Sequence, residues 1–441
     1  MKDQSDLNHQ EESSIAEKLD VGNQLESTDN TSQPSTTSDS EQIVDHNIEK
    51  EAAIRRACDL RDIDALVAYA TSEGGFLRDN VRRLAYLGPI LLQCDRDPDL
   101  GAWNNLPPHV DEDQVQLDVN RSFVYYPNCK ILARIVNSPW AKPSHSGSDS
   151  DLSLKKNELS DLIKQMLRHY PMLCYFQGYH DIVQVLLLVL GGQTAAPAVT
   201  RLSLFRIRDY MLPSLSPTVR HLQLIPAIID RADPALRHHL SEIRPFFALA
   251  ATLTLYAHDI QEYSDIARLF DFLLAREPVV SIYLFAAIIL ARKKELLEIP
   301  EDEPEMLHFT LSKLPCPLDL EGLIYRAVQL FDEYPPESLS FGAWKAIPPS
   351  SVLKTSRDTI AKQTPEEAIT LFEQQVRHLR NEERREMVVG FLWNHRRAIG
   401  SVAVTVFIAA VSIWIRKRGL DTPIWSYLDR FKSAFQVHSS S

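Results

Sequence analysis

The stretch "DIVQVLLLVLGG", residues 181–192, contains the run "IVQVLLLVL", which is apolar on all sides. A helix that is apolar all round is a buried one, so the run predicts a helix at the centre of the fold. Asp181 is expected to cap its beginning, and Gly191–Gly192 are expected to end it. Just upstream, "CYFQGYHDI" (174–182) places an amide and a glycine, Gln177–Gly178, beside this apolar helix.

The rest of the chain also favours helices. Its 441 residues include 26 prolines but only 14 glycines, and alternating strand-like runs are hard to find. After a charged, Ser-rich segment (141–158), expected to be an exposed loop, apolar residues recur at helical spacing from Leu159 until Pro171 stops the helix. Further helices are expected at 200–211, 217–230, 234–242, 246–258, 263–275 and 278–296. We therefore predict an all-α fold.

Five segments follow from composition. Residues 1–50 hold 12 acidic against 3 basic residues and almost no aromatic ones, so residues 1–48 are predicted to be a disordered acidic tail. A helical domain over 50–300 comes next. It is followed by a more charged helical extension over 301–390, a membrane span at 398–415 and a short tail at 416–441.

The span "AIGSVAVTVFIAAVSIWI" (398–415) is uncharged and is flanked by Arg396–Arg397 and Arg416–Lys417–Arg418. As a helix it would be roughly 27 Å long, enough for a thin bilayer. A buried core helix is the alternative, but such a helix is rarely bracketed by cations. The sequence therefore predicts a single transmembrane helix in the endoplasmic reticulum or early Golgi. No apolar segment follows Met1, so no signal peptide is expected and the domain should face the cytosol.

Composition also argues against several classes of protein. Outside the acidic tail the charges nearly balance, which argues against nucleic-acid binding. Five scattered cysteines form no C-x-x-C pair, so neither a zinc site nor a disulfide framework is predicted. Walker-type loops, G-x-G-x-x-G and nucleophile signatures are missing from the sequence, so we expect no nucleotide-hydrolysing site, metal or cofactor of the chain's own.

Two short motifs could carry chemistry. Gln177–Gly178 sits on a tight turn at the beginning of the buried helix, where an amide and backbone N–H groups can face a cleft suited to anions. A satisfied interhelical amide is an equal alternative. In "VQLDVNRSF" (115–123), Asp118 and Arg121 share one face of a helix, which by itself favours an ordinary surface ion pair.

Two His-Asp dipeptides, His180–Asp181 and His258–Asp259, raise another possibility. In an all-α protein such pairs occur in HD-type metal phosphohydrolases. That chemistry needs a further histidine, for which His169 could serve, and a distant aspartate that converge on a metal. The sequence shows the pairs but not the convergence.

Together these residues resemble a known family. "VQLDVNR" is similar to the I-x-x-D-x-x-R motif, and "YFQG" (175–178) matches the Y-x-Q-G motif, of TBC-domain GTPase-activating proteins for Rab GTPases. Segments 74–92, 246–260 and 268–278 resemble other parts of that domain, with Asp271 in its usual acidic position. "YFQGYHDI" and the C-terminal span resemble the endoplasmic-reticulum-anchored (member-20) subgroup. Tyr86, Val115 and His180 depart from the usual Trp, Ile and Asn.

The resemblance implies an activator that acts in trans on a GTP-bound Rab, the one of ER-to-Golgi traffic. GTP and Mg²⁺ would belong to the Rab. Arg121 would reach the phosphates and Gln177 would orient the attacking water. Asp118 would hold Arg121, Tyr175 would support the turn, and Gly178 would let the Rab approach. A catalytically silent Rab-binding membrane scaffold on the same fold is the alternative, although it would need neither Arg121 nor Gln177.

Overall fold

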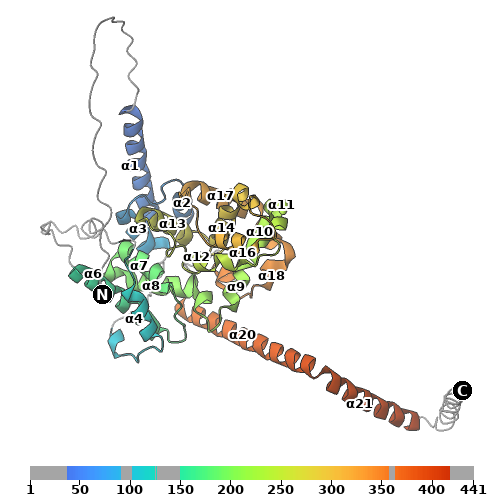
Figure 1. The fold of residues 1–441 in the computed structure, drawn as a ribbon. Coiled ribbons are helices and arrows are strands. Elements are labelled where there is room, and N and C mark those ends of the chain that lie inside the picture. Colours follow the sequence, from blue (N-terminus) through green and yellow to red (C-terminus); the bar gives the residue numbers. More distant parts are fainter. Residues whose placement is uncertain (1–36, 91–101, 125, 127–148, 357–362, 418–441) are drawn as a thin grey trace, which may run out of the picture. The chain divides into compact units, whose positions relative to one another are not determined.

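The computed structural model describes residues 37–90, 102–124, 126, 149–356 and 363–417. Every regular element in these ranges is a helix, which confirms the all-α prediction (Figure 1). The chain divides into two units, Met1–Ile48 and Glu49–Ser441. Of the acidic tail, only residues from Thr37 onward are described, and they form the beginning of α1 (Thr37–Leu60). The helix therefore starts inside the segment that the composition assigned to a disordered tail.

The helices follow one another with short connections. Before the central helix come α2 (Ile63–Thr71), α3 (Asp79–Ala85), α4 (Glu112–Asn120) and α6 (Asp149–His169). The middle of the chain forms α7 (Tyr179–Leu190), α8 (Gly192–Phe205), α9 (Ser216–Leu222), α10 (Leu224–Ala232), α11 (Pro234–His239) and α12 (Leu249–Leu253). The remainder forms α13 (Tyr263–Ala275), α14 (Val280–Ala291), α15 (Lys293–Leu297), α16 (Pro304–Leu311), α17 (Leu320–Glu333), α18 (Ala343–Ala346), α19 (Val352–Thr355), α20 (Pro365–Asn394) and α21 (Arg396–Lys417).

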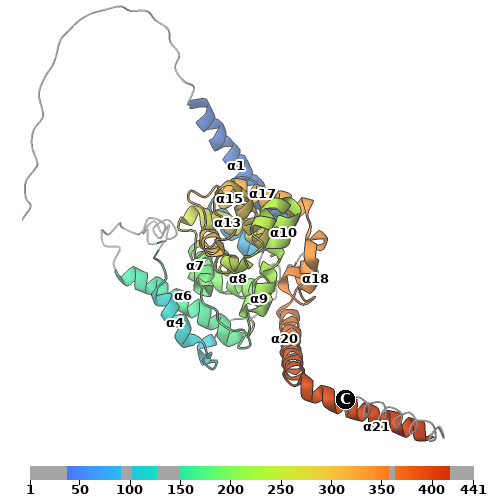
Figure 2. The same ribbon diagram turned by 45° about the vertical axis from the view of Figure 1, so that its right-hand side comes forward.

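The predicted central helix is α7. All but one of its twelve residues are buried, and it packs against α3, α6 and α8 (Figure 1, Figure 2). Gly191 ends the helix with a positive φ of 82°, as predicted, because only glycine takes that backbone conformation at low cost. The beginning differs from the prediction: the helix starts two residues before Asp181, with Gly178 at the N-cap position.

Three other boundaries correct the sequence-based expectations. Residues 149–158, part of the predicted loop, form the first turns of α6, because charged and Ser-rich residues are compatible with the exposed face of a helix; residues 141–148 lie outside the described ones. The helix expected from 200 begins at Gly192 and continues through Pro197, packed on α6 and α7. The single helix expected over 246–258 is a 3₁₀ turn (Pro245–Ala248), then α12 and further turns.

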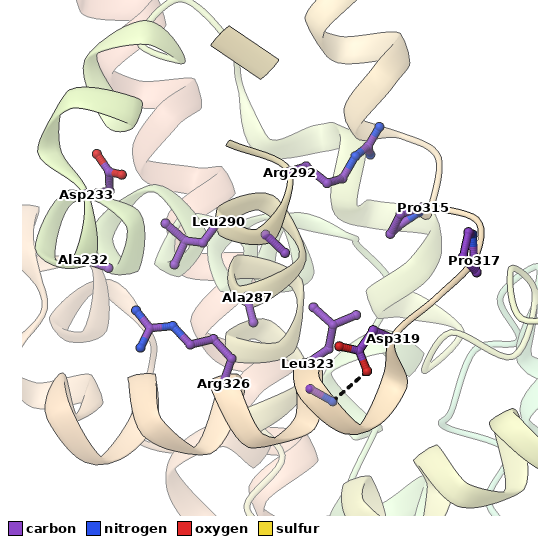
Figure 3. Close-up of a pocket in the computed structure, with 12 residues that line it drawn as sticks. Ala232, Asp233, Ala287, Leu290, Arg292, Pro315, Pro317, Asp319, Leu323 and Arg326 are labelled. Atoms are coloured by element: carbon purple, nitrogen blue, oxygen red, sulfur yellow. Dashed lines mark hydrogen bonds between the residues drawn. The ribbon is translucent and has the colours of Figure 1, made fainter. Parts of the chain in front are cut away.

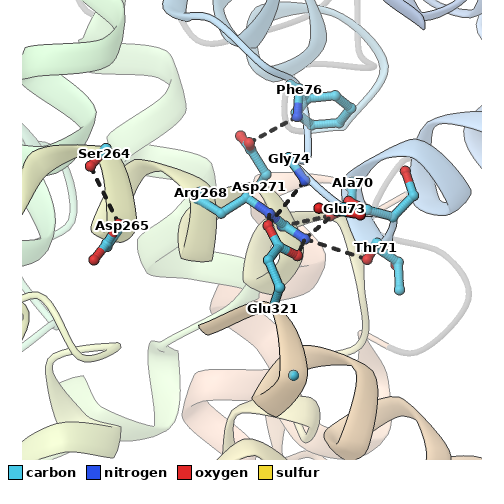
Figure 4. Close-up of polar contacts among 12 residues, drawn as sticks. Ala70, Thr71, Glu73, Gly74, Phe76, Ser264, Asp265, Arg268, Asp271 and Glu321 are labelled. Atoms are coloured by element: carbon cyan, nitrogen blue, oxygen red, sulfur yellow. Dashed lines mark hydrogen bonds and ion pairs between the residues drawn. The ribbon is translucent and has the colours of Figure 1, made fainter. Parts of the chain in front are cut away.

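A buried polar network holds the segment after α2 against α13 and α17 (Figure 4). Arg268 donates to the carbonyls of Ala70 (2.9 Å) and Ser72 (3.0 Å) and pairs with Glu321 (2.7 Å). Asp271, fully buried, accepts from the backbone N–H of Phe76 at 3.0 Å. These bonds satisfy backbone groups that would otherwise be buried without partners, so the acidic residue at 271 has a structural role.

Tyr86, which replaces the usual Trp, belongs to the same network. Its hydroxyl donates to Oδ1 of Asp271 at 2.7 Å, and Arg82 donates to the same carboxylate at 3.0 Å. An indole could offer a donor but would present it from a larger ring. The substitution therefore changes which atom reaches Asp271 and keeps a donor for it.

The extension over 301–390 packs on the same core. α17 turns its apolar face to α14, which is itself buried along almost its whole length. α20 packs on α8, and its Gln375 joins a buried carboxylate, Asp209, at 2.6 Å. Asp209 also accepts from Ser351 (2.5 Å) and lies 3.0 Å from His221 Nε2. Buried charges persist only when they are paired in this way, so these bonds fix α20 on the domain.

The predicted membrane span at 398–415 falls within α21. Among the described residues, no helix combines the length and the apolar character that crossing a membrane requires. The side chains of 398–405 and 415 lie outside the described residues.

Candidate functional site

Arg121 lies directly after the last turn of α4. Its backbone N–H donates to the carbonyl of Asp118 at 3.0 Å and so closes the helix. Its side chain is 63% exposed, whereas that of Asp118 is fully buried, and Nη2 of the arginine pairs with Oδ1 of the aspartate. As the three-residue spacing predicted, the two residues share one face of the helix. The pairing orients an exposed guanidinium from a buried carboxylate.

Asp118 is the meeting point of three donors. Besides Arg121, the amide of Gln114 donates to Oδ1 at 3.1 Å and the hydroxyl of Tyr175 donates to Oδ2 at 3.0 Å. A carboxylate with both oxygens occupied has one orientation, so it holds the arginine in a defined direction.

The turn that carries Gln177 is attached to α4 at two points. Through its side chain Tyr175 reaches Asp118, and through its backbone N–H it donates to Oδ2 of Asp111 at 2.9 Å. Cys174 is fixed in addition by a bond from its N–H to the carbonyl of Met211, 2.9 Å. Gln177 itself is exposed. The sequence left open whether this amide is a satisfied interhelical group, and its exposure disfavours that alternative.

Gly178 is required by the fold itself. Its φ is +100°, which residues with a side chain rarely adopt, and a Cβ at this position would lie 2.5 Å from Cγ2 of Thr254. Gly178 is also buried. Its missing side chain is therefore explained by packing within the chain, without reference to an approaching partner.

A cavity of about 590 Å³ brings the two motifs together. Arg121 borders it from the end of α4, and Gln177 and Gly178 border it from the turn before α7. The opposite wall comes from residues 246–258 and is largely apolar, with Phe246, Leu249, Ala250, Leu253, Thr254, Ala257 and His258. Tyr175 and Asp118 are not lining residues and lie behind the two that are. The geometry thus separates exposed polar groups from the buried groups that hold them.

Burial controls the protonation of the supporting groups. It raises the pKa of Tyr175, and the nearby charge of Asp118 raises it further, so the phenol remains a donor. Burial lowers the pKa of His180 and outweighs the opposing effects of Asp181 and Asp118. His180 Nδ1 lies 3.2 Å from the hydroxyl of Tyr175, so the residue that replaces the usual Asn still contacts the turn.

The sequence analysis missed one residue of this site, Gln184. Its side chain is 3% exposed, and its Oε1 accepts from the backbone N–H of Phe123 at 3.0 Å. Phe123 has a positive φ of 63°, so the chain turns sharply two residues after Arg121 and needs this partner. The signal was available: Gln184 is the only polar residue in the apolar run of 182–190.

Another cavity, of about 550 Å³, lies among α10, α14 and α17 and contains none of the predicted site residues (Figure 3). Its acidic groups already have partners: Asp233 pairs with Lys293, and Asp319 accepts from the N–H of Gly322 at 3.1 Å. The first cavity is therefore the candidate site.

The two His-Asp pairs do meet, but not as a metal site. His258 Nδ1 lies 3.0 Å from Oδ2 of Asp181, and His180 Nε2 lies 3.3 Å from its Oδ1. His169 instead bonds the carbonyl of Gln165 in its own helix. Within the described ranges, no group of three or more His, Cys, Asp or Glu is placed to hold a metal ion. The HD-type alternative therefore finds no ligand set there.

An all-helical domain with an arginine and a glutamine on one cavity agrees with the comparisons to known proteins. Residues 95–297 match the model of the Rab-GTPase-TBC domain, RabGAP-TBC. The chain is 32% identical over 326 residues to GTPase-activating protein gyp10 of Schizosaccharomyces pombe, covering 73% of this chain and 82% of that protein. The chain belongs to the Rab-GTPase-TBC domain family.

Two further similarities fall on the same region. The chain is 34% identical over 295 residues to human TBC1 domain family member 20, covering 66% of this chain and 69% of that protein. Among solved structures, the Chlamydomonas flagellar RabGAP TBC domain aligns with a TM-score of 0.45 and 13% identity, over 67% of this chain and 95% of that domain. The sequence relationship to gyp10 and to member 20 confirms the resemblance to TBC-domain proteins.

Proposed function

We propose that this protein accelerates GTP hydrolysis by a Rab GTPase and that it supplies Arg121 and Gln177 in trans. The observation that carries the proposal is that both side chains border one cavity of about 590 Å³. GTP and Mg²⁺ come with the Rab as its substrate and metal.

Arg121 supplies positive charge where negative charge develops on the transferred phosphoryl group and the leaving oxygen. Its exposure lets it reach into a partner, and its pairing with Asp118 limits the directions it can take. An arginine supplied in trans to a GTPase is worth roughly 10³–10⁵ in rate. Asp118 and Tyr175 act through Arg121 and the turn, and they do not touch the nucleotide.

Gln177 orients the water that attacks the γ-phosphoryl group. In Ras-type GTPases this task belongs to a glutamine of the GTPase itself. The exposed amide at the rigid beginning of α7 is suited to take it over, because both neighbouring backbone segments are fixed by hydrogen bonds. Gly178 allows the turn that presents it.

The Rab of ER-to-Golgi traffic is the proposed partner, on the ground of the resemblance to the ER-anchored subgroup. Attachment to that membrane through 398–415 is part of the same proposal and rests on the uncharged run between two basic clusters. Removal of 398–441 should release the protein from membranes in a cell fractionation and leave its activity in solution intact. A truncated protein that stays with the membranes would show that the anchor lies elsewhere.

The function is tested by single-turnover GTP hydrolysis with a panel of purified Rabs. The chosen Rab and its catalytic-glutamine mutant are each combined with the wild-type protein and with Gln177→Ala. We expect the wild-type protein to stimulate both Rabs and Gln177→Ala to lose most stimulation of both. Binding to GTP-loaded Rab should survive, because a water-orienting group acts on the transition state more than on the ground state.

Two results would contradict the role of Gln177: full activity of Gln177→Ala, or failure of the wild-type protein on the mutant Rab. Binding without stimulation of any Rab, by the wild-type protein itself, would instead favour the catalytically silent scaffold.

A further inference from the structure

His258 lines the same cavity as Arg121 and Gln177, from the turn that follows α12. Its side chain is 59% exposed. It comes from a part of the chain that neither motif covers, and the functions proposed above assign it no role. An exposed imidazole on a catalytic cavity is a group that a bound partner can contact.

Asp181 fixes the orientation of this imidazole. Its Oδ2 lies 3.0 Å from Nδ1 of His258, and its Oδ1 lies 3.3 Å from Nε2 of His180. The carboxylate is itself only 15% exposed and sits in the first turn of the rigid α7. Because Nδ1 faces Asp181, Nε2 is on the opposite edge of the ring. Within the described part of the chain, that atom has no hydrogen-bond partner.

The charged groups around His258 come from three parts of the chain. Asp181 and His180 face it from α7, Arg121 from the end of α4, and Asp259 follows it directly. The hydrogen bond to Asp181 raises the pKa of His258; burial opposes this, the charges of Asp181 and Asp259 add to it, and Arg121 opposes it. A raised pKa means that the imidazolium, with a proton on both nitrogens, persists to higher pH than in a free histidine.

We propose that His258 is a further binding residue of the activator and donates from Nε2 to an anionic oxygen of the Rab–GTP complex. Asp181 is its positioning residue. The oxygen belongs either to the γ-phosphoryl group or to an acidic side chain of the Rab. The inference rests on the proposed function and adds a third polar contact to it.

The physical case is complementarity. The cavity presents a guanidinium and an imidazolium, and the incoming GTP-bound partner presents phosphate and carboxylate oxygens. A charged donor whose ring is already oriented loses little freedom on binding, so its hydrogen bond is stronger than that of a mobile surface group.

The test compares His258→Gln, His258→Arg and Asp181→Asn in the full chain, with His238→Gln as control. His238 is an exposed histidine on α11 and is not among the cavity-lining residues. Stimulated hydrolysis is measured from about pH 6 to pH 8.5 and divided by the intrinsic rate of the Rab at each pH. Circular dichroism and thermal unfolding of each variant establish that it is folded.

The protonated form is the active one, so wild-type stimulation should fall as the pH rises through the pKa of His258, above its usual 6.5. His258→Gln should lose that step and about 10- to 100-fold in kcat/KM at low pH, the range of a charge-assisted hydrogen bond. His258→Arg should keep the stimulation without the step. Asp181→Asn should move the step to lower pH, because it removes the charge that raises the pKa. His238→Gln should follow the wild type.

The kinetic constants identify the oxygen. A fall in kcat assigns it to the γ-phosphoryl group, whose charge changes in the transition state, and a rise in KM assigns it to a Rab side chain. A His258→Gln protein with wild-type kcat, KM and pH profile would overturn the proposal. That result is distinct from failure of the proposed function, in which the wild-type protein itself would stimulate no Rab.

Discussion

The hydroxyl of Tyr175 lies 3.0 Å from Oδ2 of Asp118, and this hydrogen bond connects residues 57 positions apart in the sequence. The other oxygen of the same carboxylate holds Arg121. Gln177 follows Tyr175 by two residues, so a chain of contacts runs from one proposed finger to the other. The two fingers are therefore positioned as a unit.

Tyr175→Phe should test this connection. The variant removes one donor from a buried carboxylate, and we expect it to destabilise the protein by about 1–3 kcal/mol. Stimulated hydrolysis should fall by about tenfold, less than on loss of Arg121, because the guanidinium remains present but is less well oriented. Tyr325→Phe, at a 66% exposed position on α17, is the control and should change neither. Unchanged kcat/KM in Tyr175→Phe would show that the fingers are positioned independently.

Arg121→Ala should abolish stimulation and leave the thermal unfolding temperature nearly unchanged, because most of the side chain is exposed. Arg121→Lys should be nearly as inactive, since lysine keeps the charge but lacks the planar fork that spans two oxygens. Single-turnover hydrolysis at saturating protein measures both. Near-normal stimulation by Arg121→Ala would rule out the arginine finger.

Gly178→Ala should destabilise the protein for two reasons that can be separated. The positive φ by itself costs about 1–2 kcal/mol for a residue with a Cβ. Gly342→Ala, at φ +65° with no atom near the added Cβ, measures that cost alone. The contact with Thr254 adds to it at position 178, and the double variant Gly178→Ala/Thr254→Ser should recover that added part. Equal unfolding free energies for the 178 and 342 variants would contradict the packing explanation.

Asp209→Asn should weaken the attachment of α20 in a pH-dependent way. Burial by itself would raise the pKa of Asp209, but the hydrogen bond and charge of His221, with Arg208 and Ser351, bring it to about 2. The folded pKa is below the unfolded one, so the ionised group contributes stability above about pH 4 that is lost as the pH falls through about 2.

In urea unfolding, the wild type should exceed Asp209→Asn by about 3–5 kcal/mol near neutral pH. The difference should narrow as the pH falls toward 2. Asp332→Asn, at an exposed position on α17, is the control and should show no such trend. A constant difference at all pH values would mean that the charge of Asp209 is not what holds α20.

A fragment that ends at residue 300 should fail to fold, whereas one that ends at 390 should fold. Without 301–390, α14 loses α17 and its buried apolar side chains, Leu320, Leu323, Ile324, Ala327, Leu330 and Phe331. Each large apolar side chain contributes about 1.5–3 kcal/mol, and together they match the typical stability of a domain. Cooperative thermal unfolding, followed by circular dichroism, distinguishes the fragments.

Much of the fold was accessible from the sequence because it depends on local pattern. The apolar run of 182–190 and the two glycines after it determine a buried helix and its end, whatever surrounds them. Asp118 and Arg121 share a face because a helix repeats every 3.6 residues. The boundaries were less accessible: a charged segment such as 149–158 is compatible with a loop and with an exposed helix, and only packing decides between them.

The sequence by itself determined the helices, the two motifs and the residues within them. Only the tertiary structure decided which distant residues meet: Tyr175 with Asp118, Gln184 with Phe123, Gly178 with Thr254, and Asp181 with His258. Local pattern specifies which face of a helix is apolar, but not which partner covers that face or in what register. Contacts between residues far apart in the chain depend on how all the helices pack at once, because each interior position can be filled only once.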